Sequence, residues 1–225
     1  AIRRQRQMCI RDRKKQSQLG FNLTAGVSLV IFLMLTYGVL FHQTWIHTFD
    51  QYFGHAVRRF ISPGLSTFMI HFTKFGNFTS LLGFTVGAGL ILFLVRRIKA
   101  ALFLLINGVL LAGPVNVLVK HFINRPRPTL PHMVTVHSSS FPSGHSMSIM
   151  LIAGSLILIA NRLLKSATTK LIVGILLAII ILGIGISRIY VGVHFASDVL
   201  GGWSLGFVTL AISRYCFNRF GGGIA

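Results

Sequence analysis

Residues 171–187 read LIVGILLAIIILGIGIS, a run that has no charged side chain and whose only polar residue is its last serine. A helix rises about 1.5 Å per residue, so about 20 apolar residues cross the ~30 Å hydrocarbon core of a bilayer. With its flanking residues this run is long enough to do so. Five other stretches have the same character and lie at about 21–41, 77–95, 100–119, 145–160 and 195–213. The sequence therefore predicts an all-α integral membrane bundle of six transmembrane helices.

The composition of the chain agrees with this prediction and excludes other classes of protein. Of the 225 residues, 53% are hydrophobic and 11% are charged, and the mean hydropathy is +0.73. Soluble domains carry roughly 25% charged residues. Cys9 and Cys216 lie near opposite ends of the chain and match neither a disulfide framework nor a metal-ligand spacing. Soluble, disordered and disulfide-rich folds are therefore excluded.

We interpret the net charge of +19 as a signal of membrane topology rather than of nucleic-acid binding. In a membrane protein, Lys and Arg are enriched in the loops on the cytoplasmic side of the bilayer. We therefore expect no nucleic-acid partner. Residues 1–15, AIRRQRQMCIRDRKK, begin without Met and resemble a translated sequencing adaptor. We expect them to be a non-native or disordered basic tail. Residues 16–225 are then expected to form a single six-span domain.

The cations in the short loops predict the orientation of the chain. One side has Arg96, Arg97, Lys99, Arg162, Lys165, Lys170, Arg214 and Arg219. The other side has Arg58, Arg59, Lys74, Lys120, Arg125, Arg127 and Arg188. If Lys120, Arg127 and Arg188 are set aside as site residues, the first side has the clear excess of positive charge. This distribution predicts a plasma-membrane protein with both termini in the cytoplasm.

Residues 42–76, between the first two spans, mix aromatic and polar side chains. Such a pattern is typical of amphipathic helices that lie in the membrane interface. Ser62, Pro63 and Gly64 form a turn signal inside this stretch. We therefore expect one or two interfacial helices here, with a break at residues 62–64, and we place Asp50 in an interfacial loop.

Three polar clusters interrupt the apolar pattern, and each lies at the end of a predicted span. They read KHFINRPRP at 120–128, SFPSGHS at 140–146 and SRIYVGVHFASD at 187–198. In a six-span chain the end of span three, the start of four, the end of five and the start of six share one face of the membrane. The topology alone therefore predicts that the three clusters meet.

The residue types in these clusters favour a phosphate group as ligand. Lys120, Arg127 and Arg188 offer fixed positive charges, and a guanidinium group matches a tetrahedral oxyanion in bidentate geometry. Ser143 and Gly144 lie at the expected amino terminus of a helix, where free N–H groups and the helix dipole favour an anion.

Two histidines give the predicted site a nucleophile and an acid. His194 and Asp198 are four residues apart, so on a helix the carboxylate can bind one ring nitrogen and leave the other free to attack. His145 can protonate a departing alkoxide. An ionisable residue inside an apolar run is a functional candidate by default, which applies to Asp198. We expect His121 to face away from the site, and six other histidines to be solvated: His42, His47, His55, His71, His132 and His137.

The three clusters together resemble the signature of the type 2 phosphatidic acid phosphatase superfamily. The pattern is Lys, six residues, Arg-Pro; Pro-Ser-Gly-His; and Ser-Arg, five residues, His, three residues, Asp, and every signature position matches between Lys120 and Asp198. The resemblance implies a six-span fold with cytoplasmic termini and no metal or other cofactor.

The resemblance also implies a role for each matched residue. His194 would attack phosphorus to form a phosphohistidine, with Asp198 orienting it, and His145 would serve first as acid and then as base. The phosphoryl oxygens would be held by Lys120, Arg127, Ser143, Gly144 and Arg188.

The expected function is that of an integral membrane lipid phosphatase with its active site near the extracytoplasmic face. Its substrate would be a lipid phosphate or pyrophosphate of the undecaprenyl pyrophosphate, phosphatidylglycerophosphate or phosphatidic acid class, and the sequence leaves this choice and the oligomeric state open. One alternative is a lipid phosphotransferase of the same family, which would pass the phosphoryl group to another lipid. An alternative of a different class is an anion transporter that uses the cations for selectivity.

Overall fold

The computed structural model describes the backbone of residues 2–224 and the side chains of residues 16 and 18–224. The described backbone forms helices joined by short turns and one long loop, without a β-strand. In chain order the helices are α1 (Ile2–Leu40), α2 (Thr44–Arg58), α3 (Pro63–Lys74), α4 (Phe78–Leu94), α5 (Ile98–Leu105), the π-helix η1 (Ile106–Leu111), α6 (Ala112–Ile123), α7 (Gly144–Leu163), α8 (Ala167–Tyr190) and α9 (Ala196–Phe220). The side chains of the expected tail, residues 1–15, lie outside the described part, and its foreign origin stays a prediction. Its backbone from Ile2 onward belongs to α1.

Five segments in the described part are long and apolar enough to cross a membrane. They are Gln18–Leu40, Ile98–Ile123, Gly144–Leu163, Ala167–Tyr190 and Ala196–Phe220. Helices α3 and α4 form a sixth candidate if they count as one span with a bend of 54°. The prediction of an all-α six-span bundle is therefore confirmed, with the second span supplied by a bent pair of helices.

The third span is continuous in sequence but not in helix type. Its central turn is the π-helix η1, which lies between α5 and α6. Pro114 in α6 has no N–H to donate to the carbonyl four residues earlier, which belongs to η1. Wider turns of this kind occur where the regular hydrogen-bond ladder of a helix is interrupted. Hydropathy predicted the span but not this interruption.

The bundle is packed around α7, which contacts α8, α9, α5 and α6. Phe103 and Leu104 from α5, Leu151 from α7, Ile184 from α8 and Leu210 from α9 meet in its apolar core and are fully or almost fully buried. By contrast, α1, α4 and α8 expose many large apolar side chains. An apolar outer surface of this kind suits a lipid solvent rather than water.

Glycines allow α9 to approach its neighbours closely. A Cβ atom at Gly202 would lie 2.6 Å from the Ser143 carbonyl oxygen, and one at Gly206 would lie 2.7 Å from the Met147 carbonyl oxygen. Contacts shorter than 3.0 Å essentially never occur for real Cβ atoms. Gly202 and Gly206 are therefore positions of close helix packing.

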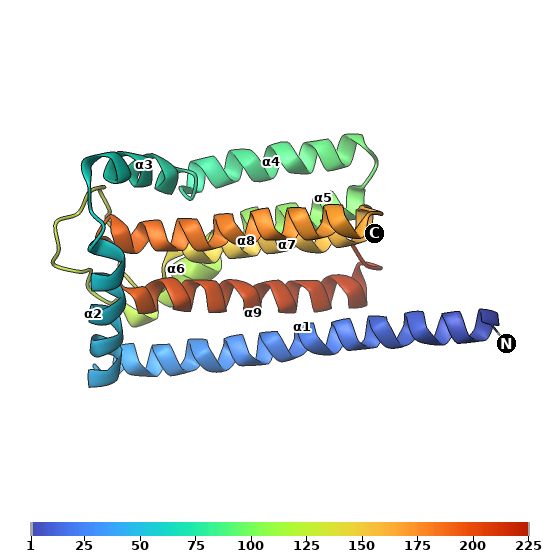
Figure 1. Cartoon of the computed structure of the whole chain (residues 1–225), viewed down its shortest axis with the longest axis horizontal. Helices are drawn as coiled ribbons and strands as arrows, with labels where there is room; N and C mark the ends of the chain where they lie inside the picture. Colours follow the sequence, from blue (N-terminus) through green and yellow to red (C-terminus); the bar gives the residue numbers. More distant parts are fainter. Residues whose placement is uncertain (1, 225) are drawn as a thin grey trace.

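Helix α2 lies across one end of the bundle of long helices (Figure 1). Between α2 and α3 the chain breaks at Ser62, whose hydroxyl caps α3 by accepting from the Leu65 N–H at 3.4 Å. The predicted break at residues 62–64 is therefore confirmed. The start of α1 and the end of α9 both lie at the opposite end of the bundle from α2 (Figure 1).

Candidate active site

The first polar cluster leaves α6 abruptly because its sequence ends the helix. Asn124 follows α6 with a φ of 41°, a left-handed conformation that asparagine tolerates, and its N–H bonds the Lys120 carbonyl. Pro126 and Pro128 cannot continue a helix. The chain therefore turns into the long loop 124–143, which brings Arg125 and Arg127 to the end of the bundle that carries α2.

Hydrogen bonds to this loop hold the two predicted cations of the cluster. The Lys120 ammonium donates to the Ser139 carbonyl at 2.5 Å and to the Ser138 hydroxyl at 3.1 Å. The Arg127 Nε donates to the Ser138 carbonyl at 2.6 Å, and its Nη1 donates to the Val193 carbonyl at 2.7 Å. The hydrogen-bond partners of both cations are thus neutral, and neither cation forms an ion pair with a described carboxylate, so both can bind an anion.

The second cluster begins α7. Ser143 is its N-cap, and the Ser143 hydroxyl accepts from the Ser146 N–H at 3.4 Å and from the Ser146 hydroxyl at 3.0 Å. The Ser143 N–H donates to the Asp198 carbonyl at 2.9 Å, which joins α7 to α9. Ser143 therefore caps the helix that starts with Gly144, and binding of phosphate by these two residues stays a prediction.

The third cluster forms the histidine–carboxylate pair. The Nδ1 atom of His194 lies 3.2 Å from Oδ2 of Asp198. The same Oδ2 accepts from the Phe195 N–H at 2.8 Å and from the Ser140 hydroxyl. Asp198 is the third residue of α9 and so also caps that helix, as in the carboxylate half of a capping box. The predicted contact is confirmed, although His194 precedes α9 and does not share a helix with Asp198 as the spacing argument assumed.

The environment of His194 keeps its ring neutral. Burial lowers the pKa of His194 to about 4, although its hydrogen bond to Asp198 acts in the opposite direction. Burial also lowers the pKa of Arg127, which the charge of Asp198 opposes. The Nη1 atom of Arg127 lies 3.4 Å from Nε2 of His194, the ring nitrogen that Asp198 does not contact. A neutral nitrogen thus faces a guanidinium group.

The predicted residues of all three clusters come together. Arg188, His194, Lys120 and Arg127 all lie close enough to His145 for their charges to act on it. Arg188 is 3% exposed, and its Nε has no hydrogen-bond partner among the described residues. His121 is exposed, which agrees with the expectation that it faces away from the site.

Two contacts to the site come from the end of α3 and from the turn that follows it, and neither was predicted from the sequence. The Oδ1 atom of Asn77 lies 2.9 Å from Nε2 of His145, and the Thr73 hydroxyl accepts from Arg188 Nη1 at 2.8 Å. Asn77 is the N-cap of α4 but makes no side-chain cap hydrogen bond. Its side chain is therefore free to hold His145.

The placement of Asp50 in an interfacial loop is wrong. Asp50 lies in α2, is 5% exposed and binds the guanidinium of Arg125, which also binds Asp198. Arg125 had been counted only as a topology charge. Arg125 is 75 residues from Asp50 and 73 residues from Asp198 in the sequence, so no local spacing could indicate these ion pairs.

Comparison with known proteins identifies the family. The sequence profile of the PAP2 superfamily, the type 2 phosphatidic acid phosphatases, matches residues 100–221. The chain belongs to the PAP2 superfamily. It is 34% identical over 187 residues to phosphatidylglycerophosphatase B of Bacillus subtilis (strain 168), a match covering 81% of this chain and 89% of that protein. It is also 34% identical over 93 residues to undecaprenyl-diphosphatase of Sulfolobus acidocaldarius, covering 41% of this chain and 37% of that protein.

Solved structures show the same relationship. The crystal structure of the PAP2-type phosphatidylglycerolphosphate phosphatase of Bacillus subtilis matches with a TM-score of 0.77 and 30% identity, covering 88% of this chain and 97% of that one. The structure of Aquifex aeolicus LpxE matches with a TM-score of 0.55 and 28% identity, covering 71% of this chain and 91% of that one. This PAP2 protein is thus a multi-pass membrane protein, and its named relatives include lipid phosphatases.

All eight predicted site residues lie within the part of the chain that matches the PAP2 profile. By contrast, Asp50, Thr73 and Asn77 come from the segment before it. Among the described residues, no group of three or more His, Cys, Asp or Glu side chains is arranged to hold a metal ion.

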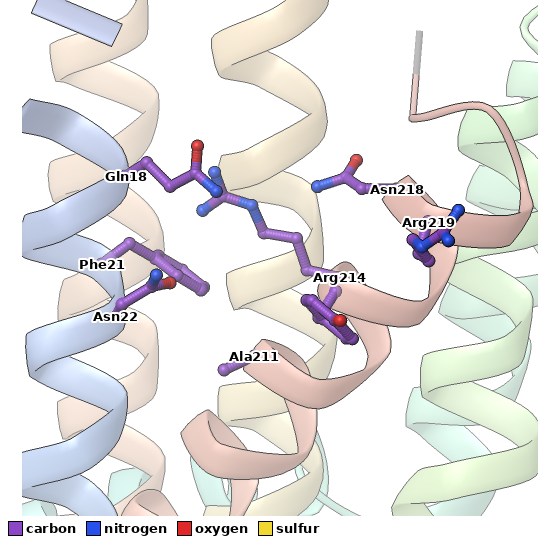
Figure 2. A pocket seen from close by; sticks show the side chains of 8 residues that line it. Gln18, Phe21, Asn22, Ala211, Arg214, Asn218 and Arg219 are labelled. Carbon is purple, nitrogen blue, oxygen red and sulfur yellow. The ribbon is translucent and has the colours of Figure 1, made fainter. Parts of the chain in front are cut away.

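A cavity of about 300 Å³ lies between α1 and α9, at the end of this PAP2 bundle opposite the candidate site (Figure 2). Arg214 stacks on Phe21 there, with its guanidinium carbon 4.1 Å from the ring centre, and Gln18 and Asn218 point toward it (Figure 2). The described lining has no histidine or carboxylate, so it lacks a nucleophile and a proton donor of the kind found around His194. The polar side chains that line this cavity are typical of the interface region at the ends of membrane spans.

Proposed function

We propose that this PAP2 protein is an integral membrane lipid phosphatase that works through a phosphohistidine on His194. Its substrate is a lipid phosphate or pyrophosphate of the undecaprenyl pyrophosphate, phosphatidylglycerophosphate or phosphatidic acid class. The observation that carries the proposal is the neutral, Asp198-bound His194 placed beside three cations that form no ion pair with a described carboxylate. The named activities of the relatives, a phosphatidylglycerophosphatase and an undecaprenyl-diphosphatase, support the same reaction class.

In the first step Nε2 of His194 attacks phosphorus and the bond from phosphorus to the lipid oxygen breaks. Because Nδ1 of His194 lies against Asp198, Nε2 is the nitrogen left to attack. His145 gives a proton to the departing lipid oxygen. Arg127 and Lys120 neutralise the phosphoryl oxygens, together with Arg188, whose buried Nε has no described partner. Stabilising the charge that develops on those oxygens is the main task in phosphoryl transfer.

In the second step a water molecule attacks phosphorus and displaces His194 from it. His145, now without its proton, accepts one from the water molecule that attacks the phosphohistidine, and His194 leaves as the neutral imidazole. Asn77 supports both steps, since its contact with Nε2 of His145 fixes the orientation of the ring. Inorganic phosphate is released and each histidine returns to its starting state.

We further propose a plasma-membrane location, with both termini in the cytoplasm and the site near the extracytoplasmic face. The excess of cations in the loops at the end of the bundle opposite the candidate site supports this orientation. Residues 16–225 act as a single domain, and the reaction requires no metal ion.

The direct test is phosphate release from a panel of lipid phosphates in detergent with a chelator present. We expect release of free inorganic phosphate, undiminished by chelation and inhibited by vanadate, which mimics five-coordinate phosphorus. Loss of activity under chelation would overturn the metal-free mechanism. Transfer of the labelled phosphoryl group to a second lipid, without free phosphate, would show a phosphotransferase instead.

A further inference from the structure

Arg125 joins the two carboxylates of the described part of the chain. Its Nη1 donates to Oδ1 of Asp198 at 2.6 Å, and its Nη2 donates to Oδ2 of Asp50 at 2.7 Å. The Asp198 side chain is fully buried, that of Asp50 is 3% exposed, and that of Arg125 is 13% exposed. A fork that binds two carboxylates through different nitrogens is a geometry that only a guanidinium group offers.

The contacts of Arg125 determine how the Asp198 carboxylate is turned. Arg125 occupies Oδ1, whereas His194, Ser140 and the Phe195 N–H all use Oδ2. The carboxylate therefore has different partners on its two oxygens and cannot rotate without losing both sets. The Phe195 ring stacks on Arg125, 4.1 Å from its guanidinium carbon, and restricts the guanidinium plane as well.

Asp50 holds Arg125 from the other side and links it to α9. Oδ1 of Asp50 accepts from the Ser197 N–H at 2.8 Å, and Oδ2 accepts from the Ser197 hydroxyl at 2.8 Å. The Ser197 hydroxyl also lies 2.8 Å from Nη1 of Arg125. Arg125, Asp50 and Ser197 thus form a closed ring of contacts beside Asp198. This ring connects α2, which lies across the end of the bundle, to the first turn of α9.

The charges in the ring make Arg125 necessary for the ionised form of Asp198. A buried carboxylate without a partner is costly and tends to take up a proton. With Arg125 present, one cation is shared by two carboxylates. Without it, Asp50 and Asp198 would be two like charges in the same buried region, and Asp198 would lose its value as an anionic partner for His194.

We propose that Arg125 is a positioning residue that fixes the Asp198 carboxylate toward His194, and that Asp50 holds Arg125 in place for this task. The helix α2 is then part of the catalytic machinery and not only a membrane-surface element. This inference rests on the proposed function, in which His194 is the nucleophile. It concerns residues outside the eight that the family signature picks out.

The test compares Arg125→Gln, Asp50→Asn and the double variant, using phosphate release from detergent-dispersed phosphatidic acid. We expect Arg125→Gln to lower kcat by about 100-fold with KM changed less than about 3-fold, because Lys120, Arg127 and Arg188 still bind the phosphate. The double variant should recover about 10-fold of this loss, since it removes the second carboxylate along with the cation.

A pH profile separates this role from a purely structural one. In Arg125→Gln the acidic limb of kcat/KM should move to higher pH, because an offsetting cation is lost beside two carboxylates near His194. It should return toward the wild-type position in the double variant. The other groups that face His194, namely Arg127, Arg188, Lys120 and His145, are the same in every variant.

Arg58→Gln is the matched control. Arg58 also ties α2 to the bundle, since its Nη1 donates to the Tyr190 carbonyl at 2.9 Å, but it does not touch Asp198. We expect Arg58→Gln to lower the melting temperature while kcat stays within about 3-fold and the acidic limb does not move.

Two outcomes would overturn the inference in different ways. If folded Arg125→Gln keeps kcat within about 3-fold and an unmoved acidic limb, or if the double variant is no better than Arg125→Gln, the ring is structural only. If the wild-type protein itself releases no phosphate while remaining folded, the proposed function fails, and the positioning role fails with it.

Discussion

Asp198 combines three tasks in one buried carboxylate. It orients His194, it caps the first turn of α9 through the Phe195 N–H, and it pairs with Arg125. Each of these contacts favours the ionised form, which offsets the cost of burial. A single carboxylate can therefore support a nucleophile inside a span region where unpaired charges are unfavourable.

The pH dependence of activity should reflect the burial of His194. Its pKa is lowered to about 4, so the attacking neutral form persists well below the usual histidine range and is lost only as the pH falls through about 4. We expect the acidic limb of kcat/KM to lie well below pH 6.5. The measurement compares a lipid monophosphate with a lipid diphosphate, since a limb common to both belongs to the enzyme. A shared limb at pH 6.5 or above would contradict this assignment.

The sequence could predict part of the site at this scale. The i, i+4 spacing indicated the contact between His194 and Asp198, and the signature positions indicated which cations would be neighbours. The sequence did not predict that Arg125 and Asp50 belong to the site, because their ion pairs join residues from α2, the long loop and α9. Contacts between such distant segments leave no periodicity or spacing in the sequence.

At the scale of helices, the site depends on how closely α7 and α9 approach. His145 lies in the first turn of α7 and Asp198 in the first turn of α9, and the two helices meet at Gly202 and Gly206. Hydropathy predicted both helices. It could not indicate the π-helical turn in the third span, because this turn does not interrupt the apolar run.

Gly202→Ala should separate α7 from α9, since the new Cβ atom would lie 2.6 Å from the Ser143 carbonyl oxygen. We expect a loss of about 1–3 kcal/mol in the free energy of unfolding and a lower kcat, because His145 and Asp198 move apart. Gly174→Ala in α8 is the control, since its Cβ atom would meet nothing within 4 Å. It should leave activity unchanged and stability equal or slightly higher. Thermal unfolding in detergent and phosphate release measure both effects, and equal behaviour of the two variants would contradict the packing argument.

At the scale of the whole molecule, both described carboxylates lie at the site end of the bundle, whereas cations lie at both ends. The candidate site, α2 and the two described carboxylates lie at one end, and the start of α1 and the end of α9 lie at the other (Figure 1). A lipid substrate can reach such a site from the membrane while its headgroup meets the cations. This arrangement explains why a phosphatase for lipids is built as a membrane bundle.

The proposed orientation can be tested with cysteine labelling in intact cells. In a variant with Cys9→Ser and Cys216→Ser, Thr135→Cys lies in the exposed loop at the site end, and Thr168→Cys lies at the exposed start of α8 at the other end. We expect a membrane-impermeant maleimide to label the cysteine at 135 in intact cells and the one at 168 only after permeabilisation. The reverse pattern would place the site in the cytoplasm.

The covalent intermediate tests the central proposal most directly. The protein is mixed with phosphatidic acid labelled in its phosphate group, quenched within one turnover and digested for mass spectrometry, with His194→Ala in parallel. We predict a phosphoryl group on His194 in the wild-type protein, none in His194→Ala, and at least about a 1,000-fold loss of phosphate release in that variant. A phosphoryl group on another residue, or phosphate release by His194→Ala at the wild-type rate, would contradict the proposed mechanism.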